Sequence, residues 1–249
     1  MSGHNKWSKI KRKKGVNDAR RSKLYTRILK EIAISVKEAG PDPDSNPRLR
    51  LALTNAKGAN MPKDNIQRAI AKASEGGSAN YQELSYEGYG PGGVAIFVDC
   101  TTDNLNRTVA NMRMYFTKYD GTLGTNGSLS FIFDHKGVFT IPQDKLDEEA
   151  LTLQMIDAGA DDVEVEEGTF TITCAFENFG SIQKAFEKLG LEPSTAGLQR
   201  IPKTFTDLDL ETARKALRLI DALEEDEDVK DVYHNLEMSE ALIKTLEEA

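Results

Sequence analysis

The order of apolar periods along residues 136–203 is the feature that most constrains the fold of this chain. Alternating apolar and β-branched residues predict strands, whereas apolar stripes at spacings of three and four predict helices. Here they follow one another as strand, helix, strand, strand, helix and strand, with a hairpin turn at Glu167-Gly168. The predicted elements are Gly137–Ile141, Leu146–Ala158, Val163–Glu167, Thr169–Ala175, Phe179–Leu189 and Glu192–Lys203. This βαββαβ order is typical of a ferredoxin-like domain.

Residues 1–77 carry only the helical period. An apolar stripe from Leu24 to Val36 predicts a helix that ends at Gly40-Pro41. Asn46-Pro47 supplies an N-cap and a proline at the first position of a second helix, and Met61-Pro62 begins a third that stops at Gly76. We therefore expect a small three-helix unit.

The rest of the chain predicts an α/β domain built from two separate segments. Strand Val94–Cys100, helix Asn104–Lys118 and strand Leu129–Phe133 come before the ferredoxin-like segment, and helix Leu210–Leu223 and strand Val229–Leu236 come after it. We expect the later elements to complete the sheet begun by the earlier ones. The predicted fold is α+β with three domains: a basic helical domain at 1–77, a discontinuous α/β domain at 78–134 plus 204–249, and an inserted ferredoxin-like domain at 135–203.

Charge is strongly segregated along the 249 residues. The whole chain holds 32 Lys and Arg against 40 Asp and Glu, a net charge of −8. Residues 1–77 hold 18 against 7, or +11, and residues 78–249 hold 14 against 33, or −19. A dense basic segment repels itself unless a polyanion neutralises it. The basic third therefore predicts nucleic-acid binding, although a solvated tail is the alternative.

The candidate phosphate-binding residues lie in the leader and at the start of the first helix. Trp7, the only tryptophan, stands among them, where it can stack on a base or instead pack into the helical unit. The predicted nucleic-acid-binding residues are Lys6, Trp7, Lys9, Lys11, Arg12, Lys13, Lys14, Arg20, Arg21, Lys23 and Arg27.

Other motifs predict structure more than chemistry. Gly88–Gly93 fits GxGxxG but precedes a strand, whereas a dinucleotide fingerprint follows one, so a turn is favoured, with a phosphate nest as a lesser option. In Thr101–Thr108 we expect Thr102 or Asp103 to cap a helix, with Asn106, Arg107 and Arg113 as alternative ligand donors.

The remaining composition argues against several classes of protein. Cys100 and Cys174 stand alone in apolar runs and predict buried thiols, and the three histidines lack metal-ligand spacing. We expect no catalytic residues, no metal, no small-molecule cofactor and no membrane partner. The amino terminus has no apolar segment of a secretory signal, which predicts a cytoplasmic protein.

Six motifs together resemble the YebC family of bacterial regulators, whose mitochondrial relatives are translational activators of cytochrome oxidase subunit I. They are Gly3–Trp7, Asn46–Arg50, Asn60–Ile66, Tyr86–Val94, Thr102–Thr108 and Gly121–Ser128. The resemblance covers essentially the whole chain. It implies three domains, a cytoplasmic location, and a regulatory role described both as DNA-binding transcription control and as support of translation on the ribosome. It carries over no catalytic residue.

These observations predict a non-enzymatic, nucleic-acid-binding regulator of gene expression, most simply a DNA-binding transcriptional regulator that acts through residues 1–77. The alternative is a translation factor or activator associated with ribosomal RNA, with the ribosome as its partner. Phosphate contacts fix position without specifying sequence, so the charge pattern favours neither nucleic acid. Only Asn5 and Asn17 among the first 30 residues carry a side-chain amide, which favours recognition of shape and charge.

Overall fold

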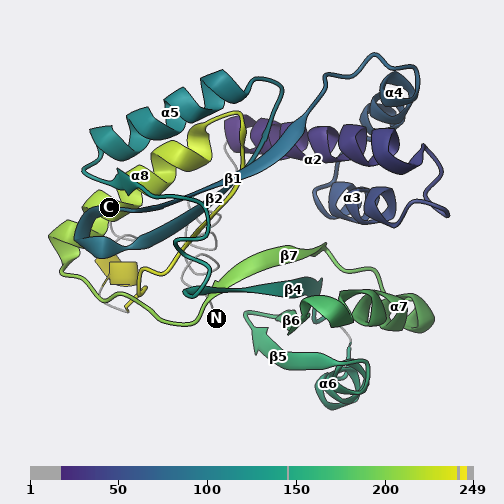
Figure 1. Cartoon of the computed structure of the whole chain (residues 1–249). Helices are drawn as coiled ribbons and strands as arrows, with labels where there is room; N and C mark the ends of the chain where they lie inside the picture. The colour runs from purple at the N-terminus through teal and green to yellow at the C-terminus, as the bar shows by residue number, and fades with distance from the viewer. Residues whose placement is uncertain (1–17, 145, 240–241, 246–249) are drawn as a thin grey trace. The chain divides into compact units, whose positions relative to one another are not determined.

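The structure is a computed structural model that describes residues 18–144, 146–239 and 242–245 (Figure 1). Two compact units emerge. One is built from Ala79–Asp134 and Arg200–Ala249 and includes Lys23, and the other is built from Leu24–Ser78 and His135–Gln199. Each contains helices and a four-stranded sheet or part of one. The predicted α+β class is confirmed, whereas the division into three domains with the stated bounds stays a prediction.

Three helices precede the first strand among the described residues. They are α2 (Asp18–Ala39), α3 (Pro47–Gly58) and α4 (Lys63–Ser74), which agree with the three predicted helices. Asn46 caps α3 as expected, because its side chain accepts a hydrogen bond from the amide of Leu49 and donates to the carbonyls of Ser35 and Gly40. The buried side of α2 and α3 consists of small and aliphatic side chains such as Ile32, Leu49 and Ala56, all fully buried.

The ferredoxin-like segment follows the predicted βαββαβ order. Its elements are β4 (Phe133–Pro142), α6 (Glu148–Asp157), β5 (Ala160–Glu166), β6 (Thr169–Ala175), the 3-10 turn η2 (Phe176–Asn178), α7 (Phe179–Leu189) and β7 (Thr195–Pro202). The strand order is β5-β6-β4-β7, with β6 antiparallel to both of its neighbours. Glu167 and Gly168 adopt φ angles of 49° and 73° in the hairpin turn, as a tight turn of this kind requires. Phe139, Phe170 and Phe186 form the centre of the core.

A second four-stranded sheet belongs to the unit that contains Ala79–Asp134. Its elements are β1 (Gln82–Tyr89), the 3-10 turn η1 (Pro91–Gly93), β2 (Ala95–Thr102), α5 (Leu105–Lys118), β3 (Thr122–Leu123), α8 (Leu210–Glu225) and β8 (Val229–His234). The strand order is β3-β1-β2-β8, so β8 completes the sheet beside β2 as predicted. Helices α5 and α8 cover one face, where Ile96, Phe116 and Leu219 meet in the core (Figure 1).

The structure corrects one predicted strand and adds two. The segment Leu129–Phe133 is not a strand of its own: Phe133 begins β4, whereas Leu129 and Ile132 lie in turns and pack with Phe97 on the second face of the sheet. Strand β1 was missed because its sequence, QELSYEGY, is mostly polar, and the two-residue β3 is too short to leave a periodic pattern. Both cysteines are buried and free, which confirms the prediction for Cys100 and Cys174.

Candidate nucleic-acid interface

The structure reaches only part of the predicted basic surface. Arg20 lies in α2, but its side chain is outside the described part of the chain. Seven of the predicted residues lie outside the described residues altogether: Lys6, Trp7, Lys9, Lys11, Arg12, Lys13 and Lys14. Their proposed role therefore stays a prediction.

The three predicted residues whose side chains are described lie on the first half of α2. Arg21 is exposed, whereas Lys23 and Arg27 are half-buried. The ammonium group of Lys23 donates a 2.6 Å hydrogen bond to the carbonyl of Glu225, the last residue of α8. A cation is favourable at a helix C-terminus, where the carbonyl dipoles point outward. Lys23 is therefore partly committed to a contact inside the protein.

Arg48 on α3 is neutralised by two acids of α2. Its guanidinium lies 2.7 Å from the Glu31 carboxylate and 2.9 Å from that of Glu38, and the Glu38 contact uses both carboxylate oxygens. Such a paired guanidinium adds little to an external field. The number of Lys and Arg residues in 1–77 thus overstates the positive charge that this segment offers to a ligand.

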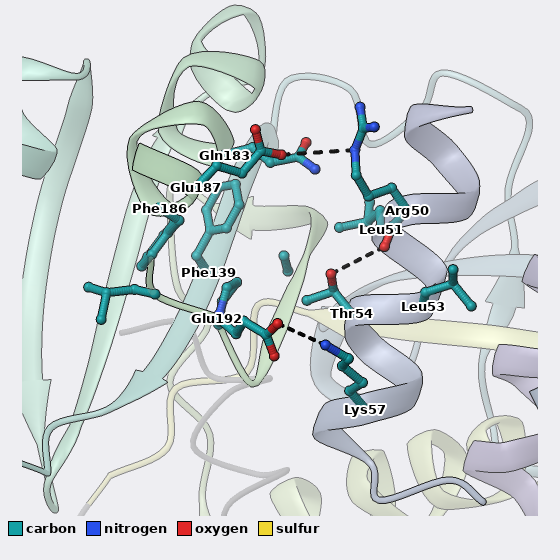
Figure 2. Close-up of a pocket in the computed structure, with 13 residues that line it drawn as sticks. Arg50, Leu51, Leu53, Thr54, Lys57, Phe139, Gln183, Phe186, Glu187 and Glu192 are labelled. Carbon is teal, nitrogen blue, oxygen red and sulfur yellow. Dashed lines mark hydrogen bonds and ion pairs between the residues drawn. The ribbon is translucent and has the colours of Figure 1, made fainter. Parts of the chain in front are cut away.

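Two more basic residues of α3 face the ferredoxin-like segment of the same unit (Figure 2). Lys57 lies 2.8 Å from the Glu192 carboxylate, and Arg50 lies 3.9 Å from that of Glu187. They stand beside a hollow of about 310 Å³ that both elements line and whose apolar wall includes Phe139. The charges of Arg50 and Lys57 therefore help to attach α3 to the ferredoxin-like segment.

Asn55 and Gly58 complete this attachment. The Asn55 side-chain amide donates to the carbonyl of Ala196 and accepts from its N–H, both at 2.9 Å. It thereby satisfies the outward backbone groups of the edge strand β7, which would otherwise remain open for pairing. Gly58 lies so close to the Ser194 carbonyl that a Cβ at this position would overlap its oxygen. This packing could not be predicted from the sequence, because it depends on a backbone contact between segments distant in the chain.

Helix α4 carries basic residues that the sequence analysis did not select. Lys63, Arg68 and Lys72 are all exposed, and α4 buries Ala73 fully. Arg68 is held along the helix by hydrogen bonds to the Asp64 carbonyl and the Asn65 side chain, at 3.1 and 2.7 Å. In the described part of the chain, Lys63 and Lys72 have no ion-pair partner within 4.0 Å. Their exposure is visible only once the buried side of α4 is known.

The glycine-rich motif is a turn that leads into β2, as favoured from the sequence. The amide of Gly90 donates to the Val94 carbonyl at 2.8 Å and that of Gly93 to the Gly90 carbonyl at 3.1 Å. Gly92 adopts φ 71°, and a Cβ there would approach the Leu208 side chain to 2.6 Å. Because two of the amides are bonded within the turn, they are not available as a phosphate nest.

Glu87 in β1 organises a second glycine-rich segment. Its buried carboxylate accepts hydrogen bonds from the amides of Gly127 and Leu129 at 2.7 and 2.6 Å, while its carbonyl accepts from the amide of Gly124. Two of the motifs that carry the family resemblance are therefore in contact. Their role in this unit is to fix the loop at residues 124–129.

The polar stretch Thr101–Thr108 also proves to be structural. Asn104 caps α5, instead of the predicted Thr102 or Asp103, because its side chain accepts from the amide of Arg107. The Arg107 guanidinium holds the buried Asp228 carboxylate through Nε and Nη2 at 2.9 and 2.6 Å. The hydrogen bonds to Asp228 and Asp103 raise the pKa of Arg107 above its already high value. Arg107 is thus engaged inside the protein, although it was an alternative ligand donor.

Residues 18–144, 146–239 and 242–245 contain neither a cluster of metal ligands nor a membrane-spanning helix. Within these ranges no three His, Cys, Asp or Glu side chains gather as metal ligands could. No helix there is both long enough and apolar enough to cross a membrane.

Comparison with known proteins gives matches along nearly the whole chain. Residues 5–76 match the TACO1/YebC protein N-terminal domain, and residues 81–236 match the TACO1/YebC second and third domain. A probable transcriptional regulatory protein of Amoebophilus asiaticus is 53% identical over 95% of this chain and 98% of its own length. One from Treponema denticola is 48% identical over 96% and 98%. A crystal structure of a conserved hypothetical protein from Aquifex aeolicus matches with a TM-score of 0.80 and 41% identity, over 90% of this chain and 93% of that one.

Proposed function

The chain belongs to the TACO1/YebC family, and from this membership we propose that it is a nucleic-acid-binding regulator of gene expression, in the first place a DNA-binding transcriptional regulator. The names of its relatives, probable transcriptional regulatory proteins, support the regulatory role. The observation that carries the proposal is the segregation of charge, +11 in residues 1–77 against −19 in the remainder. Charges segregated along the chain in this way let the basic part bind a polyanion and the acidic part serve other partners, although Arg50 and Lys57 pair with acids of the second part.

The proposed contact is made by the basic leader and the start of α2. Arg48, Arg50 and Lys57 are paired with acids, so the field of the helical unit comes mainly from other basic residues. Fields of exposed charges are screened beyond about 8 Å at physiological salt, so the acidic remainder does not cancel a basic surface farther away. Lys and Arg side chains there would neutralise phosphates, and Trp7 would stack on a base.

The acidic segments would serve a different purpose. Residues 135–199 hold 4 Lys against 13 Asp and Glu, a net charge of −9, which disfavours contact with a polyanion. We assign them to positioning or to protein contacts. In this proposal the protein acts in the cytoplasm by binding its partners, without catalysis and without a metal or small-molecule cofactor.

A translation factor that binds ribosomal RNA is the second candidate. It is favoured by the composition of residues 1–30, where Asn5 and Asn17 are the only amide side chains among many Lys and Arg. Base readout in a DNA groove commonly uses Asn, Gln and well-placed Arg, whereas RNA shape and backbone can be recognised by charge. On the ribosome the acidic segments would face proteins.

Crosslinking in cells followed by sequencing of both attached DNA and attached RNA tests the proposal. A transcriptional regulator should yield DNA enriched at defined sites, with specific affinity at least about a thousandfold above that for random duplex. Ribosomal RNA as the main product, with the protein released from ribosomal particles by a salt wash, would replace the transcriptional function with the translational one. Recovery of neither nucleic acid would refute both.

A further inference from the structure

Helices α3 and α4 form a tight helix–turn–helix. Only residues 59–62 separate the end of α3 at Gly58 from the start of α4 at Lys63. Asn60 takes a left-handed φ of 54°, and the buried Met61 donates its amide to the Ala56 carbonyl. The Tyr25 hydroxyl of α2 donates to the Asn60 carbonyl at 2.8 Å. The turn is thus tied to both preceding helices, and α4 is seen almost end-on where α2 and α3 run across the view (Figure 1).

Helix α4 turns a broad polar face to solvent. Its inner side consists of Ala73 and four half-buried residues: Asn65, Ile66, Ala69 and Ile70. The exposed residues are Lys63, Asp64, Gln67, Arg68, Ala71, Lys72 and Ser74. An amphipathic helix of this kind is fixed by its apolar side and presents the other side as a rigid surface. Asp64 is the one acid on this face. It lies in the first turn of α4, where the helix dipole stabilises a negative charge.

The exposed side chains match the chemistry of a DNA groove. Arg and Gln can bind the edges of guanine and adenine through paired hydrogen bonds. The exposed Arg68 uses Nε and one Nη2 hydrogen within the helix, which fixes the guanidinium and leaves three of its five N–H donors for a ligand. Lys63 and Lys72 are nine residues apart, or about 13.5 Å along the axis at 1.5 Å per residue. Nine residues are two and a half turns, so the two ammonium groups lie on opposite edges of the exposed face, where they can reach phosphates on the two sides of a major groove about 12 Å wide.

We propose that α4 is the helix that enters the major groove of duplex DNA, with Gln67 and Arg68 facing base edges and Lys63 and Lys72 contacting flanking phosphates. The inference rests on the proposed DNA-binding function and assigns it a surface separate from the basic leader. It also commits to DNA, because the major groove of an A-form RNA duplex is too deep and narrow for a helix. Helix α3, attached to β7 through Asn55, holds α4 in place.

Binding of the full chain to a duplex DNA and to an RNA hairpin, measured by fluorescence anisotropy over a range of salt concentrations, tests this assignment. The variant K63Q/K72Q removes two cations, and K184Q/K188Q, on the exposed face of α7, is the matched control. We expect K63Q/K72Q to make the slope of log K against log salt less steep by about 1.8, and to weaken DNA binding on the order of 50-fold at 0.1 M salt. The control should bind like the parent. Equal melting temperatures will show that all three proteins are folded.

The alternative outcomes separate this inference from the function it rests on. If the parent binds DNA with a steep salt dependence and K63Q/K72Q binds equally well, the assignment of α4 is wrong and the DNA-binding function stands. If the variant loses affinity for the RNA hairpin alone, the major-groove placement is overturned. If the parent itself binds no DNA, both the function and the assignment fail.

Discussion

The hydrogen bonds of Glu87 make a quantitative prediction about the loop at residues 124–129. Its carboxylate accepts from the amides of Gly127 and Leu129 at 2.7 and 2.6 Å, and both Glu87 and Leu129 are buried. In Glu87→Gln one acceptor oxygen becomes an NH₂ donor, so one of the two amides loses its partner; Gly127 is exposed, whereas at the buried Leu129 water cannot replace that partner. A hydrogen bond to a charged group contributes about 1.5–3 kcal/mol, and the free energy of opening the loop should fall by that amount.

Hydrogen exchange of the full chain measures this loss locally. A fall of about 1.5–3 kcal/mol corresponds to exchange about 10- to 150-fold faster at Gly127 and Leu129. Glu83→Gln on the same strand is the matched control, because Glu83 is exposed and its ion pair with Lys230 is 3.8 Å long. It should change exchange less than about threefold, as a surface substitution does. Unchanged exchange at Leu129 in Glu87→Gln, or an equal effect of both substitutions, would refute the reasoning.

Three further predictions follow from single side chains. The pKa of Asp99 is raised above 3.8, mainly by burial, so the folded protein is less stable when this carboxylate is charged at neutral pH. Asp99→Asn should therefore raise the melting temperature at pH 7. The gain should vanish near pH 3, where the carboxyl group is protonated in both the folded and the unfolded state. Asn55→Ala should destabilise by about 1–3 kcal/mol and speed exchange at Ala196, because two hydrogen bonds to strand β7 are lost. Arg107→Lys should cost about 1.5–3 kcal/mol in thermal unfolding, because an ammonium cannot reproduce the forked contact with Asp228; no change would show that the fork is dispensable.

The sequence predicts elements well where burial is one-sided. Strand β6 and helix α7 were predicted with the bounds that the structure has, because apolar residues in them alternate with polar ones at a regular period. It failed at β1, whose polar residues pair with β2 through backbone groups, and at Leu129–Phe133, whose apolar residues cover a sheet without joining it. Periodicity reports which side of a segment is buried and says less about what the backbone pairs with.

The candidate interface was predicted less completely than the fold. Local density of Lys and Arg identified the leader, but most of that segment lies outside the described residues. The same counting could not tell that Arg48 is paired with Glu31 and Glu38, since those contacts depend on how the consecutive helices α2 and α3 pack together. Counting basic residues also could not select Lys63 and Lys72. They became candidates only because the turn at residues 59–62 joins α3 and α4 into a helix–turn–helix.

We propose above all that the basic leader drives nucleic-acid binding. Because Leu24–Ser78 packs in one unit with His135–Gln199, the full chain is a better subject than a fragment cut at residue 77. The most direct measurement is the salt dependence of duplex DNA binding by the parent and by K11Q/R12Q/K13Q/K14Q. If about six phosphates are neutralised, the parent should show a slope near −5, and the variant a slope less steep by about 3.6. Identical slopes for the two proteins, or a flat response of the parent, would contradict the account.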